Sequence, residues 1–126
     1  MKDYKILESK YKNLFHESFY GVECNDGWYN LLEEMLEELK DTKITINQIK
    51  SKYADLRVYF ESPINLDKII EKYEEKAIKT CEFCGKRGER RDTRWIRVLC
   101  NSCYVKKFFK YKDVFKFDYY KYYICG

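Results

Sequence analysis

Four cysteines in the C-terminal half of the chain have the spacing of a metal site: CxxC, fifteen intervening residues, then CxxC. They are Cys81, Cys84, Cys100 and Cys103. Four thiolates at this spacing can surround one ion, since both sulfurs of each pair reach it at about 2.3 Å. The spacing predicts Zn(II), and because sulfur fills all four positions we expect a structural rather than a catalytic zinc. A redox dithiol or disulfides are the alternatives, disfavoured because the cytosol keeps thiols reduced.

Five of the six arginines lie between the two cysteine pairs, although most basic residues elsewhere in the chain are lysines. They are Arg87, Arg90, Arg91, Arg94 and Arg97, with Trp95 among them. A guanidinium group is planar and can bind a phosphate through two parallel hydrogen bonds. We therefore predict that this loop, extended by Lys106 and Lys107, contacts the phosphates of RNA, DNA or a nucleotide. Trp95 stacks on a base or, as is more common, packs on the metal module; a solvated basic surface is the plain alternative.

A second polar group is expected on a β-hairpin within ITINQIKSKYADLRVYFE, residues 44–61. We place the turn at Ala54 and Asp55, which puts Ile49, Ser51 and Tyr53 on the inner face because strand side chains alternate. The other face then carries Lys50, Lys52, Arg57 and Tyr59. With Trp28 beside it, this face is the candidate pocket for a nucleotide, or for acid–base chemistry by Lys50, Lys52 and Tyr59. The alternative is that this face is a solvated surface with no ligand.

Three helices are predicted to position these groups. Asp3 caps a first helix, in which apolar residues within 4–15 recur every three or four positions. A second helix begins at Trp28 and has a leucine-rich face opposite an acidic one. A third helix, capped by Asn65, leads the chain to Cys81. The fold class expected is α+β: N-terminal helices with a small hairpin or sheet, followed by a C-terminal zinc module.

The second cysteine pair opens a segment with helical spacing from Tyr104, and Gly85 suits the tight turn after the first pair. This stretch resembles treble-clef zinc folds, in which a knuckle is followed by a hairpin and then by a helix that carries the second pair of ligands. We expect one domain over 1–126, made of a helical and hairpin part (1–80), the zinc module (81–112) and an aromatic tail (113–126). The tail alternates like a strand and packs on the core or forms an edge for oligomerisation.

Charge is unevenly distributed along the 126 residues. Residues 1–80 carry 13 Lys and Arg against 16 Asp and Glu, whereas residues 81–126 carry 12 against 5. An anionic partner is therefore expected at the cysteine-containing end. No stretch approaches the roughly 18 apolar residues of a membrane span, so we expect no membrane contact and a cytoplasmic location in a bacterial host.

Several motifs together resemble a family of small zinc-binding proteins of phages and prophages. Its pattern has a Gly-Trp helix start, a hairpin like KxKFGGLRFY, CxxCG, and a tryptophan strand before a final pair of ligands. Gly27-Trp28, residues 50–59, 81–85 and 95–103 match it. The hairpin Gly-Gly is replaced by Ala54 and Asp55, and three further positions depart as Arg94, Val98 and Arg87. The resemblance implies a phage-related context, and two of the departures add arginine.

Enzymatic function has little support in the sequence. The only histidine, His16, lies far from the cysteine loop, and the chain has no P-loop, GxGxxG or GxSxG motif. We therefore expect a non-enzymatic, zinc-stabilised protein that recognises RNA or DNA. One alternative is a counter-defence or regulatory inhibitor that binds a host protein or sequesters a signalling nucleotide. Another is a small enzyme at the Lys50, Lys52 and Tyr59 face. Cys24 and Cys125 are interpreted as ordinary thiols.

Overall fold

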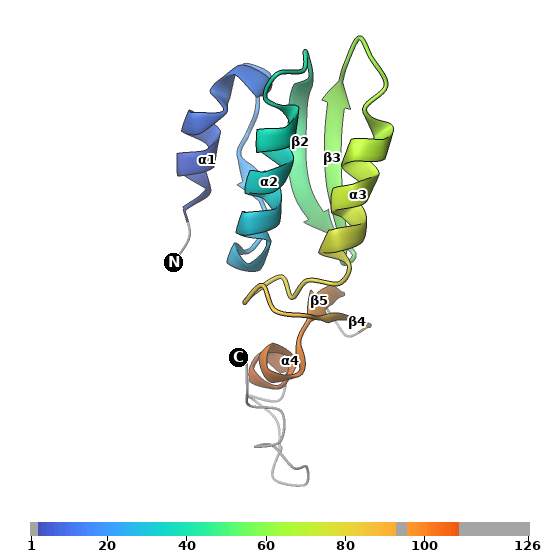
Figure 1. The fold of residues 1–126 in the computed structure, drawn as a ribbon. Helices are drawn as coiled ribbons and strands as arrows, with labels where there is room; N and C mark the ends of the chain where they lie inside the picture. The colour runs from blue at the N-terminus through green and yellow to red at the C-terminus, as the bar shows by residue number, and fades with distance from the viewer. Residues whose placement is uncertain (1–2, 93–95, 109–126) are drawn as a thin grey trace, which may run out of the picture.

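The computed structural model describes residues 3–92 and 96–108, and these form an α+β fold (Figure 1). Helices α1, α2 and α3 lie over one face of a small sheet with strand order β1-β2-β3. Strand β1 pairs in parallel with β2, and β2 pairs with β3 as an antiparallel hairpin. The helices are Tyr4–Lys10, Tyr29–Leu39 and Asp67–Ala77, and the strands are Val22–Glu23, Thr45–Lys52 and Asp55–Glu61.

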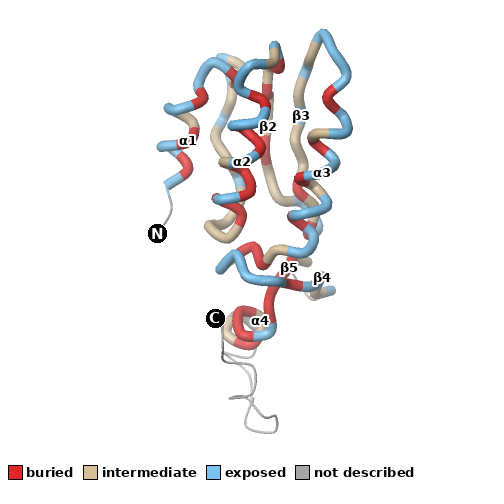
Figure 2. The backbone as a smooth tube through the Cα atoms, in the orientation of Figure 1, coloured by how far each residue is buried: buried red, intermediate tan, exposed pale blue. Residues whose placement is uncertain are grey.

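The predicted helices form because their apolar residues line one side. In α1, Tyr4 and Leu7 are buried, and the Asp3 side chain accepts a hydrogen bond from the Lys5 backbone N–H at 2.9 Å, which confirms the cap. In Figure 2, buried and exposed residues alternate along each helix at the helical period. In α2 the buried residues are Tyr29, Leu31, Leu32, Met35, Leu36 and Leu39.

Helix α3 begins at Asp67, so its N-cap is Leu66 and not Asn65 as predicted. The Asn65 Oδ1 accepts a hydrogen bond from the Asp67 N–H at 2.9 Å, from one residue before the N-cap. The buried residues of α3, Ile70, Tyr73 and Ala77, join those of α1, α2 and the sheet in one core. Burying a large aliphatic side chain of this kind contributes about 1.5–3 kcal/mol.

The hairpin turn lies one residue earlier than predicted. Lys52 pairs with Asp55, so Tyr53 and Ala54 make a two-residue turn, and both have positive φ, 52° and 70°. A turn of this hand matches the right-handed twist of the strands, which outweighs the cost of left-handed backbone in non-glycine residues. Tyr53 is 62% exposed at the turn instead of lying on the inner face.

The cysteine-containing segment forms a smaller unit at one end of these layers (Figure 1). Strands β4 (Glu89–Arg91) and β5 (Arg97–Leu99) pair as an antiparallel hairpin, and helix α4 (Asn101–Phe108) follows. Its buried residues Cys81, Leu99, Cys100 and Cys103 make a second apolar cluster.

The Gly27-Trp28 pair joins this unit to α2. The Gly27 N–H donates to the Glu82 carbonyl at 2.8 Å, and Trp28 Nε1 donates to the Thr80 carbonyl at 2.9 Å. A Cβ on Gly27 would lie 2.1 Å from the carbonyl oxygen of Cys81, so only glycine allows this approach. The Gly-Trp pair is thus a docking contact between the two parts of the chain.

Candidate metal centre and the surface around it

The first cysteine pair lies on a tight knuckle between α3 and β4. The Gly85 N–H donates to the Cys81 carbonyl at 2.9 Å, and the Cys81 N–H donates to the Lys86 carbonyl at 2.7 Å. Gly85 has φ 82°, a left-handed conformation that favours glycine. This turn brings Cys84 back toward Cys81, so both sulfurs lie on the same side of the knuckle.

The second pair lies at the start of α4. Cys100 immediately precedes the helix and Cys103 is in its first turn. The Cys103 backbone N–H donates to Cys100 Sγ at 3.4 Å, which satisfies one of the unpaired N–H groups of the helix start. The helix start therefore holds the two sulfurs of this pair close together.

The four sulfur atoms fit a single metal ion. All four Sγ atoms lie within 4.8 Å of one another, and those of Cys84 and Cys100 are 3.6 Å apart. Four sulfurs at tetrahedral positions around an ion, each about 2.3 Å from it, are separated by about 3.8 Å. A disulfide would need a separation of about 2.05 Å, and all four cysteines are free. The four predicted ligands therefore form one cluster of sulfur donors that could hold a metal ion.

A buried glutamate, Glu82, stands between the first two cysteines and was not predicted. Its carboxylate accepts from Asn25 Nδ2 at 2.9 Å, from Ser51 Oγ at 3.0 Å and from Arg97 Nη1 at 2.7 Å. Glu82 has no exposed surface, so these three contacts replace its hydration. The carboxylate joins the loop before α2, strand β2 and strand β5, and so connects the cysteine unit to the main sheet.

Two of the predicted phosphate-binding arginines serve the fold instead. Arg97 pairs with Glu82 and lies over the Phe83 ring at 5.8 Å. Arg91 donates from Nε to the Leu99 carbonyl at 3.1 Å and from Nη2 to Asn101 Oδ1 at 2.7 Å, and it lies 4.6 Å from the centre of the Tyr104 ring.

The side chain of Arg91 is only 15% exposed. The sequence shows where the arginines are, but the group that each arginine contacts depends on which residues the fold brings close to it. We therefore correct the predicted phosphate-binding set by removing Arg91 and Arg97, which hold the hairpin to α4 and to the main sheet.

The remaining basic candidates differ in their surroundings. Arg87 and Arg90 are exposed, and Arg90 Nε lies 2.8 Å from Asp92 Oδ1. Lys106 is half-buried on α4. Three predicted positions lie outside the described residues or side chains: Arg94, Trp95 and the Lys107 side chain. The predicted aromatic tail over 113–126, with Cys125, lies outside them as well.

The predicted polar residues of the hairpin lie near one another, but Trp28 does not lie beside them. Lys50 and Arg57 stand opposite each other across β2 and β3, and Lys50 Nζ lies 5.8 Å from the centre of the Tyr59 ring. Lys52 is exposed, beside the turn. Trp28 has no exposed surface and lies in the core on the helix side, so it cannot line a pocket at this face.

The histidine and the fifth described cysteine are not part of the metal centre. His16 Nδ1 lies 2.7 Å from Ser18 Oγ, near the start of the main sheet. Burial, followed by the charges of Glu82 and Glu23, raises the pKa of the Cys24 thiol far above its usual value. Cys24 is therefore a neutral thiol at physiological pH, as predicted for an ordinary cysteine.

Comparison with protein-family models, with curated proteins and with solved structures found no match to the chain. The resemblance to small phage proteins therefore stays a prediction. Within 3–92 and 96–108, none of the helices combines the length and apolar character needed to cross a bilayer.

Proposed function

We propose that the four cysteines bind one structural Zn(II) ion, and that the protein binds RNA or DNA through the exposed basic residues of the zinc knuckle. Zinc is the ion that most often occupies closed four-cysteine sites, and sulfur donors at these separations suit it. The order of knuckle, β4-β5 hairpin and α4 supports a treble-clef-like module. The proposal does not involve the predicted aromatic tail over 113–126 or the oligomer that this tail could form.

The observation that carries the nucleic-acid proposal is a group of unpaired cations on the knuckle. The Gly88 N–H donates to the Lys79 carbonyl at 2.9 Å, and Thr80 forms a β-bridge with Arg87. These backbone contacts bring Lys79, Lys86 and Arg87 together, and all three are exposed. In the described parts of the chain, none of the three side chains has an ion-pair partner. A polyanion with regularly spaced phosphates would supply those partners.

Arg91 belongs to the fold next to this surface and is not one of its cations. Because Arg91 fastens the hairpin to α4, the backbone next to Arg90 is held in a fixed position. A hollow of about 340 Å³ opens beside the knuckle between α2 and the end of α3. Lys79 lies on its wall, together with Lys76, which is paired with Glu34 at 3.0 Å. A basic rim next to a hollow gives room for a sugar or base beside the bound phosphate.

The metal part is tested by elemental analysis of freshly isolated protein and by thiol titration with and without a chelator. We expect one zinc per chain and four additional reactive thiols after chelation. The zinc assignment would be contradicted if the isolated protein held no metal and its four clustered cysteines were oxidised. That result would favour the redox alternative.

The partner is tested by fluorescence anisotropy with labelled single-stranded RNA, single-stranded DNA and duplex DNA at rising salt. We expect the logarithm of the affinity to fall linearly with the logarithm of salt concentration. The triple variant Lys79→Ala, Lys86→Ala, Arg87→Ala should bind at least about tenfold more weakly, with a slope smaller by about 2 for single strands and by about 2.7 for duplex DNA.

The matched control removes three exposed lysines that follow α1, follow α2 and lie at the start of α3, at the helix ends opposite the cysteine unit (Figure 1): Lys12→Ala, Lys43→Ala and Lys68→Ala. It changes the net charge by the same amount. Equal losses in the two triple variants, or binding that does not respond to salt, would contradict the proposed surface.

A further inference from the structure

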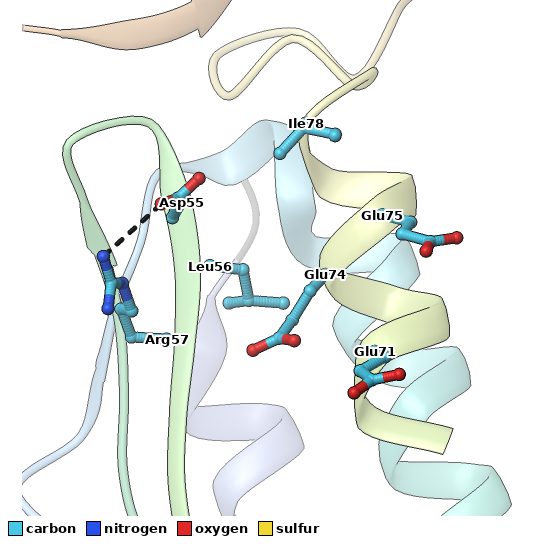
Figure 3. Close-up of a pocket in the computed structure, with 7 residues that line it drawn as sticks. All are labelled: Asp55, Leu56, Arg57, Glu71, Glu74, Glu75 and Ile78. Atoms are coloured by element: carbon cyan, nitrogen blue, oxygen red, sulfur yellow. Dashed lines mark hydrogen bonds and ion pairs between the residues drawn. The ribbon is translucent and has the colours of Figure 1, made fainter. Parts of the chain in front are cut away.

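A groove of about 380 Å³ runs between the edge strand β3 and helix α3, on the side of the sheet distant from β1 (Figure 3). Ile78 at the end of α3 supplies exposed apolar surface, whereas Leu56 of β3 lies beneath the groove and is only 1% exposed. Figure 3 shows Leu56 and Glu74 pointing into the space between strand and helix. The groove is separate from the knuckle surface described above.

The charge of the groove arises from the way α3 distributes its ionic residues. Lys72 and Lys76 point toward α2, where their Nζ atoms lie 2.6 Å from Glu38 and 3.0 Å from Glu34. The glutamates Glu71, Glu74 and Glu75 line the groove instead, and none has an ion-pair partner in the described parts of the chain. Burial and, next, the charge of Glu71 raise the pKa of Glu74, as expected for a carboxylate with too little positive charge near it.

The remaining charges at the groove do not neutralise it. Arg57 Nη2 lies 3.4 Å from Asp55 Oδ2, so its charge is shared with a further carboxylate. The Arg57 Nε atom is buried and has no hydrogen-bond partner. The residues that line the groove therefore include four carboxylates and one guanidinium, an excess of negative charge that favours a cationic partner.

The edge of β3 offers backbone groups as well as charge. Because Lys52 and Asp55 close a two-residue turn, they form a hydrogen-bonded pair, and such pairs alternate along an antiparallel ladder. Leu56 and Val58 then direct their N–H and C=O groups away from β2. In the described parts of the chain, β3 has β2 as its only strand neighbour, and no other backbone group bonds to it. An open edge of this kind can accept an added strand.

We propose that an extended basic peptide segment of a partner protein docks along β3, adds a fourth strand to the sheet and places its cationic side chains against the glutamates of α3. Helix α3 lies beside β3 in Figure 1. Glu71 and Glu75 are four residues apart, about 6 Å along the helix. Same-face residues of a strand repeat every two positions, about 6.8 Å. The spacing favours a segment with Lys or Arg at alternate positions.

The test uses the full chain with its metal bound and an acetylated eight-residue peptide in which lysine and valine alternate. Its matched probes are a peptide of the same composition with the lysines in one block, and the alternating peptide with backbone N-methyl groups on the edge that would pair with β3. We expect saturable one-to-one binding of the alternating peptide in calorimetry at physiological salt, and at least tenfold weaker binding of both matched probes. Equal binding of all three would overturn the added strand, because charge alone would then explain it.

Two protein variants separate this groove from general acidity. The double variant Glu71→Gln, Glu75→Gln should bind the alternating peptide at least tenfold more weakly. The control variant Glu17→Gln, Asp41→Asn changes two exposed acidic residues elsewhere and should keep the affinity for this peptide within twofold. Equal losses in both double variants would overturn the site. Circular dichroism of each variant confirms that the fold is retained.

Amide hydrogen exchange locates the added strand. Exchange at Leu56 and Val58 should slow at least tenfold when the peptide binds, with no comparable change at the knuckle. Unchanged exchange at both residues would overturn the proposal. Strong protection in the free protein would also overturn it, since the edge would then be occupied by another part of the chain or by a second copy.

Discussion

Arg97 Nη1 lies 2.7 Å from Oε2 of Glu82, so that a fully buried carboxylate between two cysteines of the sulfur cluster is paired with an arginine of strand β5. The same carboxylate accepts from Asn25 and Ser51 of the N-terminal part. The ion pair therefore joins the metal unit to the main sheet. Its geometry explains why this arginine belongs to the fold rather than to a binding surface.

Replacing Glu82 tests this connection. Glu82→Ala should lower the free energy of unfolding by about 3 kcal/mol, because it leaves Arg97, Asn25 and Ser51 without their shared acceptor. Glu82→Gln should cost less, since one amide oxygen still accepts a hydrogen bond. Urea unfolding of the zinc-loaded protein measures both. The control is Glu89→Ala, whose side chain is 76% exposed and should change stability by less than about 0.5 kcal/mol; a similar small effect of Glu82→Ala would contradict the connection.

Gly27 provides a second test of the same junction. An alanine Cβ there would meet backbone atoms of Cys81 and Glu82 at 2.1 to 2.7 Å, which no side-chain rotation can relieve. Gly27→Ala should therefore cost more than about 3 kcal/mol and weaken zinc retention. Thermal unfolding and metal content are the measurements. Gly21→Ala is the matched control, because its Cβ has space and only the positive φ is strained, for about 1–3 kcal/mol; a cost for Gly27→Ala no larger than that for Gly21→Ala would contradict the close approach.

Variants of Arg91 and Arg87 should separate the effect on stability from the effect on nucleic-acid binding. Arg91→Ala removes two hydrogen bonds and the contact with Tyr104, and should destabilise the protein by about 1–2 kcal/mol while the folded protein keeps its nucleic-acid affinity within about twofold. Arg87→Ala should leave unfolding unchanged and weaken binding. Urea unfolding and anisotropy titration are run on both variants. If Arg91→Ala instead weakened binding and left stability unchanged, the division of roles would be reversed.

The hairpin turn predicts a stabilising substitution. Tyr53 has φ 52° and is 62% exposed, so the left-handed backbone is not offset by burial of its ring. Tyr53→Asn should raise the free energy of unfolding by about 0.5–1 kcal/mol, since asparagine tolerates this conformation. Tyr53→Phe, which keeps the strain, should have little effect. A loss of stability in the asparagine variant would indicate that the Lys52 contact with the ring outweighs the strain.

Local patterns could be predicted from the sequence. Apolar residues at helical spacing identified α1, α2 and α3, because each helix must bury one side. The two CxxC pairs identified the sulfur cluster, because two residues between cysteines bring both sulfurs to one ion. The hairpin was identified, but its turn was misplaced by one residue, since neither Tyr53 nor Ala54 is typical of a positive-φ turn.

The sequence by itself thus determined the helices, the hairpin and the four sulfur ligands, because these depend on residues close together in the chain. Only the tertiary structure decided which side chains meet. Glu82 contacts Asn25 across 57 positions, Ser51 across 31 and Arg97 across 15, and no local period records such pairings. Arginine is equally suited to a phosphate and to a buried carboxylate. Its role in this protein is set by whichever anion the fold places beside it.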